Sequence, residues 1–177
     1  MSPTPIALRA AAVLTFALGG CASWPGADDA SNIIVVRHAE KVADGSDDPA
    51  LTDAGKARAE AISRWLSDSD VVAVYSSDTR RTRQTATPTA ESHGVPVILY
   101  DADTAAEQLA ARLRQAHPRG TVLVVGHSNT APGIAAALCG CPVEPMSEEE
   151  YGRRMTVHTD GDGDITLLTA PLPTPYG

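Results

Sequence analysis

The stretch NIIVVRHAEK, at residues 32–41, decides the fold because an apolar run changes there into charged and titratable groups. Residues 32–36 are rich in β-branched side chains and show no polar alternation, which is typical of a strand buried on both faces. Such strands occur in parallel sheets that are covered by helices. Arg37 and His38 would then lie at the carboxyl end of the strand, where open α/β sheets bind their ligands.

Strand and helix patterns alternate along the rest of the chain. Strands are predicted over residues 71–76, 95–100 and 121–127, and helices over residues 53–67, 80–93, 104–117 and 131–138. The segments RRMTVHT and DITLLTA flank an Asp/Gly-rich turn and predict an antiparallel hairpin at the end. We therefore expect a three-layer α/β sandwich, with a mostly parallel sheet, helices on both faces and an antiparallel C-terminal edge hairpin.

The first predicted helix has both a cap and an apolar stripe. Thr52 stands where an N-cap residue is expected, because its hydroxyl can accept a hydrogen bond from the first turn. The apolar stripe is predicted to consist of Ala57, Ala61, Ile62 and Trp65.

Length and charge restrict the class of protein. A chain of 177 residues has room for one domain with a sizeable core. Its formal net charge of −8 disfavours binding to nucleic acid or to an anionic membrane surface. Any anion must therefore be held by a local cluster of arginines.

The N-terminal segment has the layout of an export signal. Residues 1–21 contain one basic residue, a short apolar run and then Leu-Gly-Gly-Cys, which resembles a bacterial lipobox. We expect a lipoprotein-type signal peptide over residues 1–21, lipidation at Cys21, a tether over residues 22–31 and the folded domain over residues 32–177. The expected location is the periplasmic side of the bacterial envelope. An ordinary secretory signal with a chance cysteine is the alternative.

Cys139 and Cys141 flank a single glycine. An exported protein can form disulfides, but a bridge between residues two apart is strained. Two free thiols and a small disulfide ring therefore both stay open. A redox or metal site lacks partner ligands nearby, so we interpret the pair as structural.

Polar groups follow each predicted strand. They are Arg37 and His38, then Ser76, Ser77 and Arg81, then Tyr100, Asp101 and Asp103, and finally His127, Ser128 and Asn129. In a parallel sheet these groups meet at one edge. Guanidinium groups suit phosphate oxygens, and an imidazole is a competent nucleophile at neutral pH. The set predicts metal-free phosphoryl transfer through a phosphohistidine.

Two kinds of metal site are alternatives that the sequence disfavours. A zinc site would need a third ligand, and the sequence contains no HxH or HExxH motif. The DGDGD run at residues 160–164 resembles the start of a calcium-binding loop. However, Ile165 and Pro171 stand where an EF-hand needs glycine and glutamate. A hairpin turn is favoured there.

Four ordered motifs resemble the histidine phosphatase superfamily, in the branch with phosphoglycerate mutases and small phosphohistidine phosphatases. RHAE at residues 37–40 resembles its RHG/RHA signature. LTDAGKARA (51–59), YSSDTRRTRQTA (75–86) and VLVVGHSNT (122–130) resemble its further motifs. The resemblance covers about residues 32–177, and it is specific for the superfamily but weak for the substrate.

The resemblance implies roles for individual residues. His38 would be the nucleophile, with Arg37, Arg81 and His127 binding the phosphate oxygens and Asn129 close to the phosphate. Glu40 and Lys41 either line the mouth of the site or are exposed loop residues.

Many members of the family carry a carboxylic acid that protonates the leaving group, and no residue here matches it by motif. Asp101 and Asp103 are candidates only because they lie just past the third predicted strand. The mutases carry a Trp-Asn pair soon after the RHG motif, and its absence here counts against a mutase.

The function expected from the sequence is therefore that of a phosphatase without cofactor or metal. It would hydrolyse phosphomonoesters or phosphoramidates through a phosphohistidine on His38. Its partners would be a small phosphorylated substrate or a phosphoprotein, and a membrane through the lipid at Cys21. The alternatives are a catalytically inactive lipoprotein that binds a phosphate ligand, and a mutase-type transfer.

Overall fold

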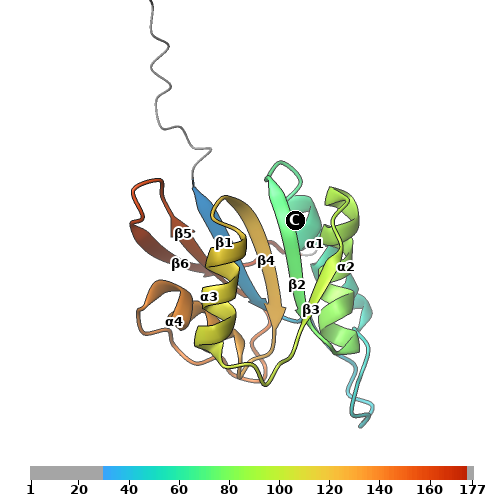
Figure 1. Cartoon of the computed structure of the whole chain (residues 1–177). Helices are drawn as coiled ribbons and strands as arrows, with labels where there is room; N and C mark the ends of the chain where they lie inside the picture. Colours follow the sequence, from blue (N-terminus) through green and yellow to red (C-terminus); the bar gives the residue numbers. More distant parts are fainter. Residues whose placement is uncertain (1–29, 175–177) are drawn as a thin grey trace, which may run out of the picture.

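A mixed six-stranded sheet runs through residues 30–174, the part of the chain that the computed structural model describes (Figure 1). The strands are β1 (Ser31–Arg37), β2 (Val71–Ser77), β3 (Val97–Tyr100), β4 (Gly120–Gly126), β5 (Arg153–Thr159) and β6 (Ile165–Pro171). The helices are α1 (Asp53–Trp65), α2 (Arg80–His93), α3 (Ala106–Ala116) and α4 (Ala131–Cys139). Every predicted element is present.

The strand order is β3-β2-β4-β1-β5-β6, with the first four strands parallel. β5 is antiparallel to β1, and β6 is antiparallel to β5. The predicted class is therefore confirmed, including the antiparallel hairpin at the edge. Because β1, β2 and β4 are parallel neighbours, their carboxyl ends lie at one edge of the sheet, at the bottom of Figure 1.

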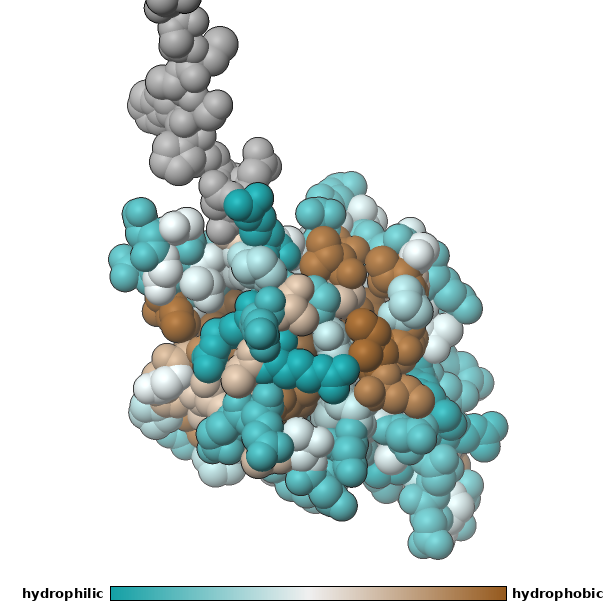
Figure 2. Space-filling model, viewed as in Figure 1, coloured by the Kyte–Doolittle hydropathy of each residue, from teal (hydrophilic) through white to brown (hydrophobic). Residues whose placement is uncertain are grey.

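Two apolar layers cover the sheet. Ile33 and Val35 of β1 belong to a cluster with α3 and α4, whereas Ile34 and Val36 belong to a cluster with α1 and α2. The uninterrupted apolar run in β1 thus supplies side chains to both layers, as predicted for a central strand. Figure 2 shows apolar residues, in brown, over β2 and β3 beside α3.

The first helix begins as predicted, but its buried face is different. The Thr52 hydroxyl accepts a hydrogen bond from the amide of Gly55 at 3.0 Å. A Cβ atom on Gly55 would lie 2.2 Å from the carbonyl oxygen of Glu40, so this contact requires glycine. Trp65, predicted to be buried, is 37% exposed, and its ring packs against the Arg154 guanidinium at 4.4 Å. Leu66 takes the buried position instead.

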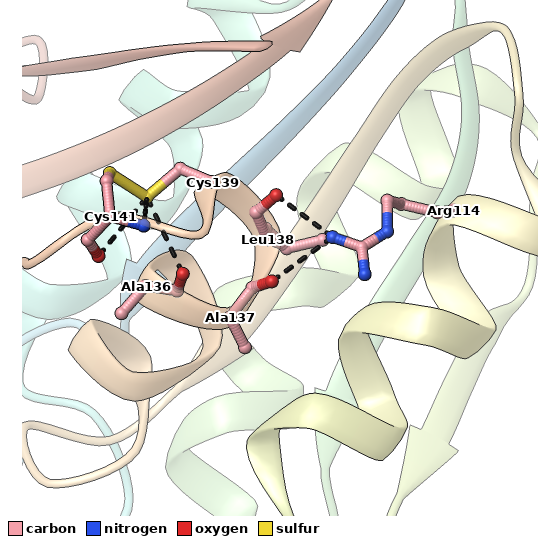
Figure 3. The surroundings of a disulfide bond; sticks show 6 residues. All are labelled: Arg114, Ala136, Ala137, Leu138, Cys139 and Cys141. Carbon is pink, nitrogen blue, oxygen red and sulfur yellow. Dashed lines mark hydrogen bonds between the residues drawn. A yellow bond between two sulfur atoms is a disulfide. The ribbon is translucent and has the colours of Figure 1, made fainter. Parts of the chain in front are cut away.

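Cys139 and Cys141 form a disulfide at the end of α4 (Figure 3). Gly140 between them has a φ of 64°, a left-handed conformation that glycine adopts without strain. Arg114 of α3 donates hydrogen bonds to the carbonyls of Ala137 and Leu138. The small ring is therefore the correct alternative, and it closes the C-terminus of α4.

Some predictions concern residues outside the described range. The signal peptide at residues 1–21, Cys21 and residues 22–29 of the tether all lie there, as do residues 175–177. Ser31, assigned to the tether, is the first residue of β1. Within residues 30–174, none of the helices has the length and apolarity needed to cross a membrane.

Candidate active site

His38 and His127 meet where β1 and β4 end. Arg37 pairs with Gly126 in the parallel register, and the amide of His38 donates to the Gly126 carbonyl at 2.9 Å. The two imidazole centroids lie 5.4 Å apart in an edge-on arrangement. The structure therefore brings together the two histidines that the sequence placed after different strands.

The hydrogen bond of His38 fixes its tautomer. Nδ1 lies 2.8 Å from the carbonyl oxygen of Ala39, which can only accept, so Nδ1 carries the proton. Nε2 then holds the free lone pair. Burial, together with the charges of Arg37 and Arg81, lowers the pKa of His38 to about 4 despite this hydrogen bond. The imidazole is therefore neutral at pH 7, as a nucleophile requires.

His127 is oriented through a short chain of hydrogen bonds. Its Nδ1 lies 3.5 Å from Nη2 of Arg81, which can only donate, and its Nε2 lies 2.8 Å from the hydroxyl of Ser77. We therefore assign the proton to Nε2, which donates to Ser77, while the Ser77 hydroxyl donates to that of Thr82 at 3.1 Å. Burial, followed by the charge of Arg81, lowers the pKa of His127 to about 4.

Arg81 enters the site from the first turn of α2, and Asp48 lies 3.6 Å from its Nη1. Among the described residues, the buried Nε–H groups of Arg81 and Arg37 have no hydrogen-bond partner. Buried donors without a partner are rare in folded proteins. An anion bound beside these guanidinium groups would satisfy them.

Arg37 holds a segment that we call the wall, residues 147–151. Its Nη1 donates to the carbonyls of Ser147, Glu148 and Glu150 at 3.0, 2.7 and 3.0 Å. Its Nη2 lies 3.1 Å from a carboxylate oxygen of Glu148, and the guanidinium packs 4.1 Å from the ring centroid of Tyr151. Arg37 is only 1% exposed, so it connects the end of β1 to the wall from inside.

A cavity of about 370 Å³ opens between these groups. We call His38, Arg81 and His127 its floor. The cavity is lined by His38, Lys41, Arg81, Ala102, Asp103, His127, Ser128, Asn129, Thr130 and Glu148. The predicted residues Lys41, Asp103 and Asn129 therefore lie at the cavity with the floor.

Two predicted site residues lie elsewhere. The Glu40 carboxylate accepts hydrogen bonds from Nε of Arg58, at 3.0 and 2.9 Å, and does not line the cavity. Despite the opposing effect of burial, the hydrogen bond from Arg58 holds the pKa of Glu40 below its usual value. The Asp101 carboxylate accepts from the amide of Asp103 at 2.9 Å and lines a neighbouring hollow. Both side chains stabilise local backbone and helix contacts.

Glu148 lines the cavity and was missed by the sequence analysis. One carboxylate oxygen accepts from the Ser128 hydroxyl and the other from Arg37. The hydrogen bond from Ser128, followed by the charge of Arg37, lowers the pKa of Glu148, so the side chain is a carboxylate at neutral pH. Nothing in the acidic run SEEE, at residues 147–150, distinguishes it from a solvated loop.

The turn between β5 and β6 uses its own carboxylate. Asp160 accepts from the amides of Asp162 and Asp164, at 3.0 and 2.9 Å, so the hairpin turn is confirmed. Over residues 30–174, the structure contains no group of three or more His, Cys, Asp or Glu side chains placed to hold a metal ion.

Comparison with known proteins agrees with this arrangement. The model of the histidine phosphatase superfamily (branch 1) matches residues 33–102, which agrees with the resemblance predicted from the motifs. No curated protein matches the chain.

Solved structures are similar in fold. A mycobacterial glucosyl-3-phosphoglycerate phosphatase is 18% identical, with a TM-score of 0.63 over 80% of this chain and 98% of its own. A putative phosphohistidine phosphatase from Nakamurella multipartitia is 22% identical, with a TM-score of 0.56 over 81% and 98%. A phosphoserine phosphatase from Entamoeba histolytica is 17% identical, with a TM-score of 0.60 over 81% and 98%. At these identities the likeness shows the fold.

Proposed function

We propose that the chain, whose residues 33–102 match the model of the histidine phosphatase superfamily, is a member of that family and a phosphatase whose nucleophile is Nε2 of His38. The observation that carries the proposal is the state of that imidazole. His38 lines the cavity, its Nδ1 proton is engaged with Ala39, and its lowered pKa leaves the Nε2 lone pair free at neutral pH. The phosphatases named among the similar folds support the same reaction class.

The reaction would proceed in two displacements. Nε2 of His38 attacks phosphorus, the bond to the leaving group breaks, and the leaving group departs with the electron pair. Water then attacks the phosphohistidine, releases inorganic phosphate and loses a proton, while Nε2 recovers its lone pair. Arg81 lines the cavity beside His38 and would stabilise the charge on the phosphoryl oxygens, while Nδ1 of His127 would help to orient the Arg81 guanidinium. The Nε–H of Arg37, which has no partner among the described residues, would also stabilise the negative charge on the phosphoryl oxygens.

The leaving group defines the substrate range that we propose. Glu148 is ionised at neutral pH and is therefore a poor proton donor, which leaves Asp103 as the predicted acid candidate that lines the cavity. Groups that depart without strong protonation, such as aryl phosphates and phosphoramidates, should react best. Simple alkyl phosphates should react more slowly, because a positioned general acid typically contributes about 10²- to 10⁴-fold.

A trapping experiment tests the proposal. Purified protein is incubated with a labelled aryl phosphate in the presence of a chelator and then quenched. We expect release of phosphate and an acid-labile, base-stable label on His38. Binding of phosphate without turnover would instead support the inactive binding lipoprotein, and transfer to a second hydroxyl of the substrate would support a mutase. Turnover that the chelator abolishes would contradict the metal-free mechanism.

We propose further that lipid at Cys21 anchors the enzyme on the periplasmic side of the envelope. The lipobox-like sequence Leu-Gly-Gly-Cys supports this proposal. β1 starts at Ser31 and ends at Arg37, so the first described residues and His38 lie at opposite ends of a strand about 20 Å long. A tether entering there would leave the cavity facing away from the membrane. Mass spectrometry of the membrane fraction tests the anchor, and an unmodified Cys21 at the mature N-terminus would refute it.

A further inference from the structure

The floor of the cavity carries a positive charge, and most of the charged groups around the floor are negative. The floor contributes the guanidinium of Arg81 beside the neutral imidazoles of His38 and His127. Glu148 and Asp103 contribute carboxylates around it, and Lys41 contributes one ammonium group. A phosphate on the floor would therefore have two carboxylates and one ammonium group around it.

Glu148 is held in place although its side chain is 72% exposed. One carboxylate oxygen accepts from Ser128 and the other from Nη2 of Arg37, while the Glu148 carbonyl accepts from Nη1 of the same arginine. Arg37 itself is buried and contacts two further carbonyls of the wall. The carboxylate is thus a fixed part of the cavity rather than a freely rotating surface group.

A fixed carboxylate affects which phosphorylated molecules can bind. The phosphoryl group of a substrate is a dianion near neutral pH, so its approach to His38 brings like charges together. Lys41 offsets this repulsion in part, and Asp103 increases it. A positive charge on the substrate, next to the phosphoryl group, would replace the repulsion with an attraction to the carboxylate of Glu148.

We propose that Glu148 makes the site selective for substrates that carry a positive charge close to the phosphoryl group, such as an ammonium or a protonated imidazole. The inference rests on the proposed function for the reaction, but the binding selectivity can be measured without turnover. Glu148 acts here as a specificity-determining residue, because a carboxylate held ionised by Ser128 and Arg37 attracts cations rather than donating a proton.

Two phosphonates of equal size provide the test. Propylphosphonate and 2-aminoethylphosphonate differ in one terminal group, methyl or ammonium, and neither contains a P–O bond to a leaving group. At about pH 9.3 both phosphonates are mainly dianions and the ammonium is still mostly charged. Calorimetry gives the two dissociation constants for wild type, Glu148→Gln and a control, Glu149→Gln. Glu149 is an exposed neighbour that does not line the cavity, and its substitution removes the same charge from the chain.

The proposal predicts shifts in opposite directions. Glu148→Gln should bind propylphosphonate about three- to tenfold more tightly and 2-aminoethylphosphonate about three- to tenfold more weakly, whereas Glu149→Gln should leave both constants unchanged. Tighter binding of both ligands would show that Glu148 merely competes with phosphate. Weaker binding of both would show that it only supports the wall. Either result, or no change, overturns the proposal.

The same protein separates this result from the reaction itself. If wild type does not hydrolyse phenyl phosphate but Glu148→Gln shifts the two dissociation constants in opposite directions, the proposed phosphatase reaction is refuted and the proposed selectivity stands. If wild type hydrolyses phenyl phosphate but the opposite shifts are absent, the selectivity is refuted and the phosphatase reaction stands. A urea unfolding curve of Glu148→Gln that matches wild type ensures that the comparison is made on folded protein.

Discussion

The floor and the wall of the cavity come from parts of the chain with very different signals. His38 and His127 lie directly past buried strands and Arg81 lies in the first turn of the helix after β2, at positions that the strand pattern and a motif both identify. The wall, residues 147–151, lies in a connection between α4 and β5 without helix or strand, and side-chain contacts with Arg37 and Ser128 bring it to the site. Residues placed by the backbone of the sheet can thus be predicted, whereas residues placed by side-chain contacts across the chain cannot.

Arg37 belongs to both regions, and this makes the comparison testable. Its place after β1 makes it part of the predicted phosphate site, but four of its hydrogen bonds go to the wall. Substitutions in the floor should therefore change the reaction alone. Substitution of Arg37 should change the reaction and the stability together.

The largest effect is expected at the centre of the floor. His38→Ala removes the nucleophile, so kcat should fall on the order of 10⁴-fold or more, and no acid-labile label should form. The control is His93→Ala, at the C-terminus of α2 and outside the cavity, which should keep normal turnover. Activity of His38→Ala near that of wild type would rule out the proposed intermediate.

The next comparison sets Arg37→Lys against Arg81→Lys. Either lysine keeps a charge, but Arg81→Lys loses the planar fork that suits phosphate oxygens and Arg37→Lys loses the Nε–H that lacks a partner within residues 30–174, so kcat/KM should fall about 10²-fold in both variants. Arg37→Lys should also destabilise the protein by about 2–4 kcal/mol, because several carbonyls of the wall lose a buried charged donor. Urea unfolding and steady-state kinetics measure the two quantities separately.

Arg81→Lys should lose much less stability, since within residues 30–174 the polar partners of its guanidinium are Asp48 at 3.6 Å and His127 at 3.5 Å. Equal destabilisation by the two substitutions would mean that the contacts of Arg37 to the wall contribute little. The division between floor and wall would then have no energetic basis.

The titration of the floor is the third test. His38 and His127 both have a pKa lowered to about 4, first by burial and then by nearby cationic groups. An ordinary histidine titrates near 6.5, so both should stay neutral in NMR titrations of the free protein as pH falls from 7 to 5. The unfolded chain binds protons in that range, and therefore stability should decrease as pH falls below about 6.5 towards 4. Normal titration of either imidazole would contradict the buried, neutral floor.

The fold was predictable because its signals are local. β-branched runs such as residues 32–36 and the N-cap Thr52 define elements whatever lies far away in the sequence. Trp65 shows the limit of this approach. A helical stripe alone does not reveal that Arg154, on a different strand, covers the exposed indole.

The site was predictable where the sheet determines it. Parallel pairing of β1 with β4 brings His38 beside His127, as expected from the order of the strands. Glu40 follows the same strand, but an arginine on α1 holds its carboxylate away from the cavity. Glu148 reaches the cavity from 110 residues further along the chain than His38, through contacts with Arg37 and Ser128. Neither contact has a sequence signature.

The smallest expected effect concerns the two aspartates after β3. Asp103 lines the cavity, whereas the Asp101 carboxylate accepts a hydrogen bond from the amide of Asp103 and lines a neighbouring hollow. If neither protonates the leaving group, Asp101→Asn and Asp103→Asn should each change the hydrolysis of phenyl phosphates by no more than about twofold, well below the 10²- to 10⁴-fold typical of a positioned acid. The measurement is a series of substituted phenyl phosphates with one simple alkyl phosphate.

Wild type should then show a steep dependence of kcat/KM on the pKa of the leaving group, because poor leaving groups receive no proton. A shallow dependence in wild type that becomes steep in Asp103→Asn would identify Asp103 as a general acid. The side of the cavity opposite the wall would in that case take part in the chemistry, and alkyl phosphates would enter the substrate range. With Asp101→Asn as the matched substitution two residues away, an effect confined to Asp103→Asn would come from the cavity rather than from the turn.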